Sequence, residues 1–132
     1  MAYANALTAC AMTGVIWFVQ LVHYPLFAAV GDTWPAYHRE HLRRVTWVVA
    51  PLMVVELGTS ALLLGEGALG VAGLALAAST WLFTFALAVP GHNALEATFD
   101  PAVARRLITA GWLRTAAWTG HAGVALALLE RS

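Results

Sequence analysis

The sequence predicts an all-α fold, an integral membrane four-helix bundle of up-down-up-down topology, and three observations favour it. Of the 132 residues, 61% are hydrophobic and only 11% are charged, whereas an ordinary globular domain carries about 25% charged residues. Four apolar stretches fill most of the chain, and about 20 such residues span a bilayer. The short segment Gly65-Glu66-Gly67 predicts that the second and third stretches are antiparallel neighbours.

The expected elements form one transmembrane domain over residues 1–132. The expected helices are residues 3–29, 45–64, 69–89 and 107–129, with an amphipathic turn at 34–44 that leads into the second helix. Pro90-Gly91 is expected to end the third helix. Thr33 before Trp34-Pro35, and Asp100 before Pro101, are typical of an N-cap followed by proline in the first turn.

The first helix is expected to be retained in the membrane rather than cleaved as a signal peptide. No Arg or Lys precedes Cys10, and the apolar run continues past it to Phe27, whereas a signal peptide has a basic start and a short apolar core. As the single cysteine, Cys10 excludes an intrachain disulfide.

The basic residues, all of which are arginines, predict the orientation. Five of them flank the loops that join helices one to two and three to four, namely Arg39, Arg43, Arg44, Arg105 and Arg106. Only Arg131 flanks the opposite side. By the positive-inside rule, these loops face the cytoplasm and both termini lie outside a bacterial-type inner (cell) membrane. Since the net charge is zero, no nucleic-acid partner is expected. The expected partners are the lipid bilayer and further copies of the chain in a homo-oligomer.

Four histidines are expected near the cytoplasmic end, on three separate segments. His38 and His41 are three residues apart on the amphipathic turn, His23 lies near the end of helix one, and His92 follows Pro90. Imidazole nitrogens bind Zn, Cu, Fe and haem iron, so all four are candidate metal ligands. His23 and His92 are also the candidate axial pair for haem, with Gln20 and Asn93 orienting the ligands.

A second polar set lies deeper in the apolar stretches. Glu56 falls near the expected bilayer midplane, and on helix four Arg114, Trp118 and His121 form one stripe at i, i+4 and i+7. A carboxylate at that depth takes up a proton or recruits a partner. The stripe is expected to face Glu56 and to give a Glu–Arg or Glu–His pair. This pair would form part of a proton path or a substrate pocket, or it would act only as a structural clamp between helices.

Several motifs resemble known membrane proteins. Four segments resemble a group of small, uncharacterised bacterial four-helix membrane proteins: His23 to Phe27, Tyr37 to His41, Pro90 to Leu95 and Trp112 to Thr119. More distantly, Pro25, the turn after Pro90 and Arg114-Thr115 resemble the anthrone-oxygenase-like family, although His92 stands where that family usually has Asn. The resemblance implies oxygenation of an activated polycyclic phenol without an obvious bound cofactor.

Three functions remain open at this level. The first is a membrane oxidoreductase, oxygenase-like, with a histidine-rich site for a transition metal (Cu, Fe or Zn) or haem and an apolar or aromatic small-molecule substrate. The second is a homo-oligomeric small-solute or proton-coupled binding or transport module that uses Glu56, Arg114 and His121. The third is a structural accessory membrane protein. No nucleotide-binding or serine-esterase motif is present.

Overall fold

The computed structural model describes residues 1–131, and long helices dominate it. Three of the four long helical segments contain local changes of helix type. The first segment consists of α1 (Ala2–Phe18), the π-helix η1 (Val19–His23), α2 (Tyr24–Leu26) and the 3₁₀ turn η2 (Phe27–Ala29). The second is the 3₁₀ turn η3 (Gly31–Thr33) with α3 (Trp34–Leu62). The third is α4 (Ala68–Phe83), the π-helix η4 (Thr84–Ala88) and α5 (Val89–Ala94), and the fourth is α6 (Pro101–Leu129).

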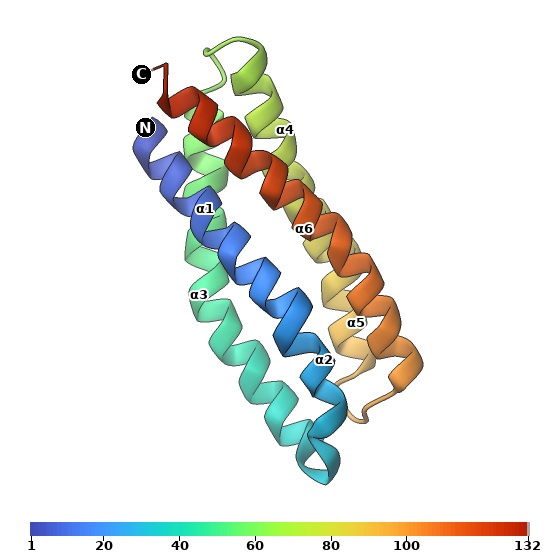
Figure 1. Ribbon diagram of the computed structural model, residues 1–132. Coiled ribbons are helices and arrows are strands. Elements are labelled where there is room, and N and C mark those ends of the chain that lie inside the picture. Colours follow the sequence, from blue (N-terminus) through green and yellow to red (C-terminus); the bar gives the residue numbers. More distant parts are fainter. Residues whose placement is uncertain (132) are drawn as a thin grey trace.

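The helices form a four-membered bundle in which each packs mainly against two neighbours. Helix α1 packs against α3 and α6, and α4 also packs against α3 and α6. Figure 1 shows both termini and the α3–α4 turn at one end of the bundle, with the α2–α3 and α5–α6 connections at the other. The five arginines near those two connections therefore lie at one end of the molecule.

The helix starts agree only in part with the N-caps expected from the sequence. The Asp100 carboxylate accepts hydrogen bonds from the backbone N–H groups of Ala102 and Val103, at 2.7 and 3.2 Å, and this cap starts α6 at Pro101, earlier than residue 107. Thr33 precedes α3 but makes no capping hydrogen bond, because η3 already continues into the helix. Its hydroxyl donates instead to the carbonyl of Val30.

Pro90 does not end the third helix, contrary to the expectation from the Pro-Gly pair. Residues 84–88 form a π-helix, and the chain then continues as helix to Ala94. The same arrangement precedes Pro25, where the π-helix covers Val19–His23. A proline ring collides with the carbonyl four residues earlier in an α-helix, and here those carbonyls belong to Leu21 and Ala86. Since both lie inside the wider π-turns, the helices pass through the prolines without ending.

The bundle has a largely apolar exterior, and its interior contains both apolar and polar side chains. Leu7, Phe18, Leu62, Leu82 and Phe85 are among the large hydrophobic side chains that are more than half exposed. Alanine, methionine and aromatic side chains form much of the buried interior, which also contains Asn5, Gln20, His38, Glu56, His92, Arg114 and His121. So many exposed large apolar side chains are unusual for a soluble protein and are consistent with a membrane protein.

Three helical segments are long and apolar enough to cross a membrane: Ala2–Ala29, Gly31–Leu62 and Ala68–Ala94. The sequence analysis predicted four, and α6 is not among them despite its length. Its low hydropathy comes largely from residues that face the interior. Arg114 is 8% exposed, and Trp118 and His121 are 1% and 0% exposed, whereas Leu113 and Leu126 on the same helix are exposed.

Candidate functional site

The four histidines predicted from separate segments converge at the arginine-rich end of the bundle. We call His23, His38, His41 and His92 the histidine cluster. His23 Nε2 lies 2.8 Å from His41 Nδ1, and His38 Nε2 lies 3.0 Å from His92 Nδ1. The two pairs are in contact, because the ring centroids of His41 and His92 are 5.6 Å apart. Helix α3 supplies His38 and His41, His23 is the last residue of the π-helix η1, and His92 lies in α5, which follows the π-helix η4.

A directed chain of hydrogen bonds links the cluster to α6. The Arg114 guanidinium donates to the Tyr24 hydroxyl oxygen at 2.9 Å, and the Tyr24 oxygen lies 3.1 Å from His92 Nε2. Because Arg114 can only donate, the Tyr24 proton is free for His92 Nε2. His92 then carries its own proton on Nδ1 and donates it to His38. Among residues 1–131, the buried Nδ1 of His38 has no hydrogen-bond partner, so the chain ends on an unsatisfied nitrogen.

Aromatic rings enclose the cluster on the side of the α2–α3 connection. Phe27, 2% exposed, lies edge-on to all four imidazoles, with centroid separations of 5.2 to 6.4 Å. Trp34 stacks on His38 at 4.8 Å and donates its indole N–H to the Leu95 carbonyl at 2.7 Å. These rings exclude water from that side. Sequence reasoning did not single out Tyr24, Phe27 or Trp34, although Tyr24 and Phe27 lie next to His23 in the chain.

The imidazole nitrogens hydrogen-bond to one another and do not converge on a single point. In residues 1–131, no group of three or more His, Cys, Asp or Glu side chains is arranged to hold a metal ion as it stands. The reason is visible in the pairs, because the nitrogens of His23 and His38 face the nitrogens of His41 and His92. A metal ion would replace these mutual hydrogen bonds after rotation of the imidazole rings.

Gln20 and Asn93 are not placed to orient the histidines as the sequence analysis expected. Gln20 is buried, but its amide donates to the Ile108 carbonyl on α6 at 2.6 Å. Asn93 is exposed at the surface. The groups next to the imidazoles are instead the Tyr24 hydroxyl and, through it, Arg114.

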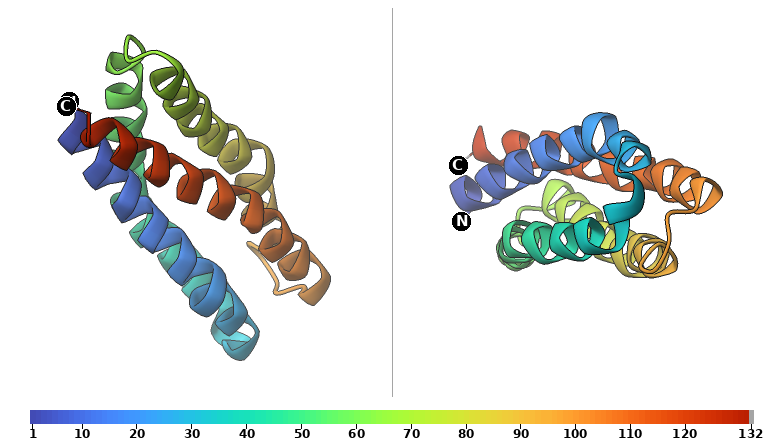
Figure 2. Two further views of the ribbon diagram at one scale, coloured as in Figure 1. Left: turned by 45° about the horizontal axis from the view of Figure 1, so that its top comes forward. Right: turned by 90° about the horizontal axis from the view of Figure 1, so that it is seen from below.

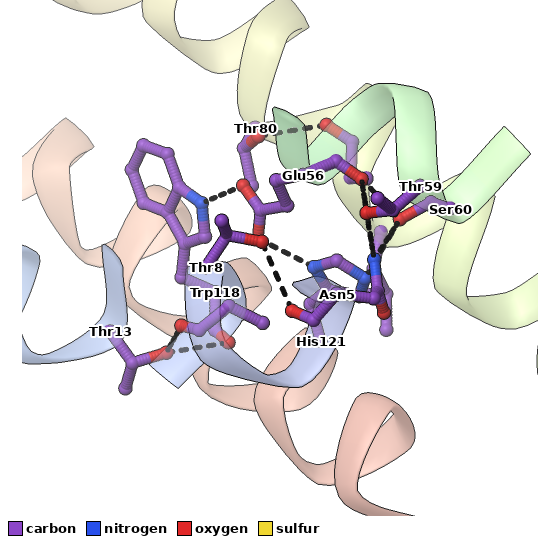
Figure 3. A network of polar contacts seen from close by, with 12 residues as sticks. Asn5, Thr8, Thr13, Glu56, Thr59, Ser60, Thr80, Trp118 and His121 are labelled. Atoms are coloured by element: carbon purple, nitrogen blue, oxygen red, sulfur yellow. Dashed lines mark hydrogen bonds and ion pairs between the residues drawn. The ribbon is translucent and has the colours of Figure 1, made fainter. Parts of the chain in front are cut away.

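A second polar network, the Glu56 network, has Glu56 at its centre, and Figure 3 shows it from close by. The Glu56 carboxylate accepts from His121 Nδ1 at 2.6 Å and from the Trp118 indole N–H at 2.9 Å. His121 Nε2 lies 3.1 Å from the Ser60 hydroxyl, and the Asn5 amide donates to the same hydroxyl at 2.9 Å. Residues from α1, α3 and α6 are thereby joined.

The Ser60 hydroxyl donates to the Glu56 carbonyl at 2.7 Å, which ties the network to the backbone of α3. Of the two partners expected for Glu56, His121 is the one in contact with it. Arg114 instead donates to the Tyr24 hydroxyl beside the histidine cluster.

A cavity of about 250 Å³ lies beside the histidine cluster. His41 and His92 line it together with Tyr24, Arg114 and Trp118. Apolar side chains form most of the remaining wall, including Met12, Ile16, Val45, Val49 and Met53. Two histidines of the cluster therefore border an apolar chamber of small-molecule size.

Comparison of the chain with protein-family models, with curated proteins and with solved structures finds no match.

Proposed function

We propose that the chain is a multipass membrane protein whose histidine cluster binds a redox-active transition metal ion, copper or iron, beside an apolar substrate chamber. The observation that supports this proposal is the convergence of four imidazoles from three separate segments, two of which, His41 and His92, line the cavity. Imidazole is a preferred ligand of both metals. A purely structural role does not require four histidines to meet, because one hydrogen bond per helix contact would suffice.

The donor set fits a single ion better than a porphyrin. A haem would have to lie between its axial imidazoles, whereas these rings are in hydrogen-bond contact with one another and with Phe27. An ion of atomic size needs only rotation of the rings. In this arrangement the unpartnered Nδ1 of His38 carries the proton, because Nε2 accepts from His92, so a metal ion would bind there only after displacing that proton.

Tyr24 and Arg114 would orient the ligands without binding the metal. The Tyr24 hydroxyl fixes the ring of His92 and sets which nitrogen carries the proton. Arg114 holds that hydroxyl and places a positive charge at the cavity wall. When bound, copper or iron would supply one-electron chemistry, and the surrounding aromatic rings would keep water away from it.

The bundle is proposed to span a bacterial-type inner membrane in the up-down-up-down sense, with the histidine end at the cytoplasmic face. The apolar exterior and the arginines at that end support this orientation. Helix α6 would be the fourth span, because its polar residues face the bundle interior rather than lipid. The Glu56 network would serve as the clamp that holds α1, α3 and α6 together.

The test is elemental analysis and absorption spectroscopy of the protein purified in detergent, beside a His23→Ala/His92→Ala double variant. We expect close to one copper or iron per chain in the parent and a loss of that metal in the double variant. The matched control is His121→Gln, which alters the one histidine outside the cluster and should retain the metal if it folds.

Two outcomes would overturn the proposal. One is a parent that stays metal-free after supplementation with copper, iron and zinc salts. The other is metal that remains in the folded double variant. Binding of zinc alone would establish a metal site but contradict redox chemistry, since zinc does not change oxidation state.

A further inference from the structure

Arg114 is a buried positive charge for which the described residues provide no negative partner. It is 8% exposed, and its one side-chain hydrogen bond goes from Nη2 to the neutral Tyr24 hydroxyl. The buried carboxylate of Glu56 is occupied by His121 and Trp118 instead, and no carboxylate among residues 1–131 pairs with Arg114. A charged side chain inside a membrane protein is normally paired or faces a cavity, and Arg114 lines the cavity.

The guanidinium of Arg114 has donors left for a ligand in that cavity. It carries five N–H donors, and those on Nε and Nη1 make no hydrogen bond in the described part of the chain. Neither nitrogen is among the unpartnered side-chain atoms of residues 1–131 that protein encloses fully, so both keep accessible surface. A guanidinium favours carboxylate and phosphate groups. The wall of the cavity therefore offers a binding point for an anion.

The cavity opens sideways between α3 and the third helical segment. Thr46 and Ala50 on α3, and Phe85 and Val89 on the third segment, are exposed residues that line it. Both segments are long and apolar enough to span a membrane. In the proposed membrane placement, a molecule would enter from the lipid side, so it must carry substantial apolar surface as well as its negative charge.

The wall also determines where the charged and apolar parts of such a molecule lie. The charge lies close to the histidine cluster, because Arg114 contacts His92 through Tyr24. Along α3 the lining continues from His41 to Met53, roughly 18 Å at 1.5 Å per residue, and Met53 belongs to a buried apolar cluster. A volume of about 250 Å³ lies below the usual range of ligand pockets and suits one alkyl chain rather than the two chains of a phospholipid.

We propose that the cavity binds a single-chain fatty acid. Its carboxylate accepts from the free donors of Arg114, beside His41 and His92, and its alkyl chain lies along the apolar wall toward Met53. This inference deepens the proposed function by naming the substrate class of the chamber, and it rests on the proposed membrane placement. Binding of the acid does not need the metal, so the two ideas can fail separately.

The experiment is calorimetric titration of metal-free, chelator-treated protein in detergent with decanoate, at about pH 8, where a carboxylate is ionised. Decanol has the same chain without the charge, and acetate has the same charge without the chain. We expect decanoate to bind at least tenfold more tightly than either. Arg114→Gln should weaken decanoate binding at least tenfold and leave decanol binding unchanged, whereas Arg114→Lys, which keeps the charge, should retain the preference for decanoate.

Matched controls make the result specific to the cavity. Arg105→Gln removes an exposed arginine that does not line this cavity and should bind decanoate like the parent. Ala50→Phe places a large side chain at the exposed lateral opening and should weaken the binding of both decanoate and decanol.

Three outcomes would overturn the proposal: equal affinity for decanoate and decanol, unchanged decanoate binding in Arg114→Gln, and acetate binding as tight as that of decanoate, which would indicate a site for small anions. Decanoate binding in a protein that proves unable to bind copper or iron would refute the proposed function alone.

Discussion

At the scale of single residues, a substitution of Glu56 distinguishes a structural clamp between helices from a transport site. Its carboxylate accepts from both His121 and Trp118. In Glu56→Gln the amide oxygen can accept from only one of them, and the other buried donor then faces an amide N–H₂ group. We expect the free energy of unfolding to fall by about 3 kcal/mol, measured by denaturation of the helical signal in detergent.

The control for this prediction is Glu40→Gln, the same change on an exposed carboxylate that pairs with Arg43 and Arg44. Exposed ion pairs contribute little, so its unfolding curve should match that of the parent. If Glu56→Gln retains full stability and instead loses binding of a solute, the residue is part of a ligand or proton site, and the clamp assignment is wrong.

Tyr24 provides a second test at residue scale. Tyr24→Phe removes the only hydroxyl between Arg114 and His92 in the described contacts, while the aromatic ring still fills the same space. If the Tyr24 hydroxyl orients a metal ligand, metal affinity should fall about 10- to 100-fold. Competition with a calibrated chelator measures this. A variant with unchanged affinity would show that His92 needs no orienting partner.

Sequence reasoning located the histidines but not their geometry. Equal depth along the helices was enough to group His23, His38, His41 and His92. The pairing of ring nitrogens was not predictable, because it depends on two π-turns that rotate His23 and His92 relative to the helices before them. The partner of Arg114 was not predictable either. The stripe that it forms with Trp118 and His121 is visible in the sequence, but its partner, the Tyr24 hydroxyl, comes from a segment far away in the sequence.

At the scale of helical elements, the two π-turns are the features most closely tied to the site. Each covers five residues, and a single residue separates it from the proline that follows, Pro25 or Pro90. Short π segments within α-helices occur frequently at functional sites. Here each wider turn includes the carbonyl four residues before its proline, which the ring would otherwise meet, whereas Pro51 is accommodated within α3 without a π-turn. They also have a consequence, because they turn the two histidine-bearing ends toward α3.

Pro90→Ala tests that link. Alanine restores the N–H group and removes the steric reason for the wide turn, so residues 84–88 can revert to α-helix and rotate His92 away from His38. We expect the helix content to be kept and metal affinity to fall at least about tenfold. Circular dichroism and chelator competition measure the two quantities on the same preparation.

Pro51→Ala is the matched control, because Pro51 lies within α3 with no π-turn before it. That variant should bind metal like the parent. A Pro90→Ala protein with unaltered affinity would mean that the π-turn persists without its proline, and the steric account would then fail. The sequence did not reveal this role, since a Pro-Gly pair is read by rule as the end of a helix.

At the scale of the whole molecule, the distribution of polarity is the main structural fact. Large hydrophobic side chains are exposed on the outside, and many of the buried polar residues are hydrogen-bonded across helices. In lipid there is no hydrophobic force between helices, so polar contacts and close packing must hold them together. The all-helical fold was therefore predictable from composition, while the contacts that join the helices were not.

The same distribution predicts how the molecule sits in the membrane. In a Cys10→Ser background, Glu130→Cys would place a thiol at the end that carries both termini, and Ala97→Cys would place one in the α5–α6 connection (Figure 2). With arginine-rich connections in the cytoplasm, a membrane-impermeant maleimide should label residue 130 in spheroplasts and residue 97 only after lysis. Labelling in the reverse order would place the histidine cluster at the outer face. A metal ion bound by the cluster would then be acquired from outside the cell.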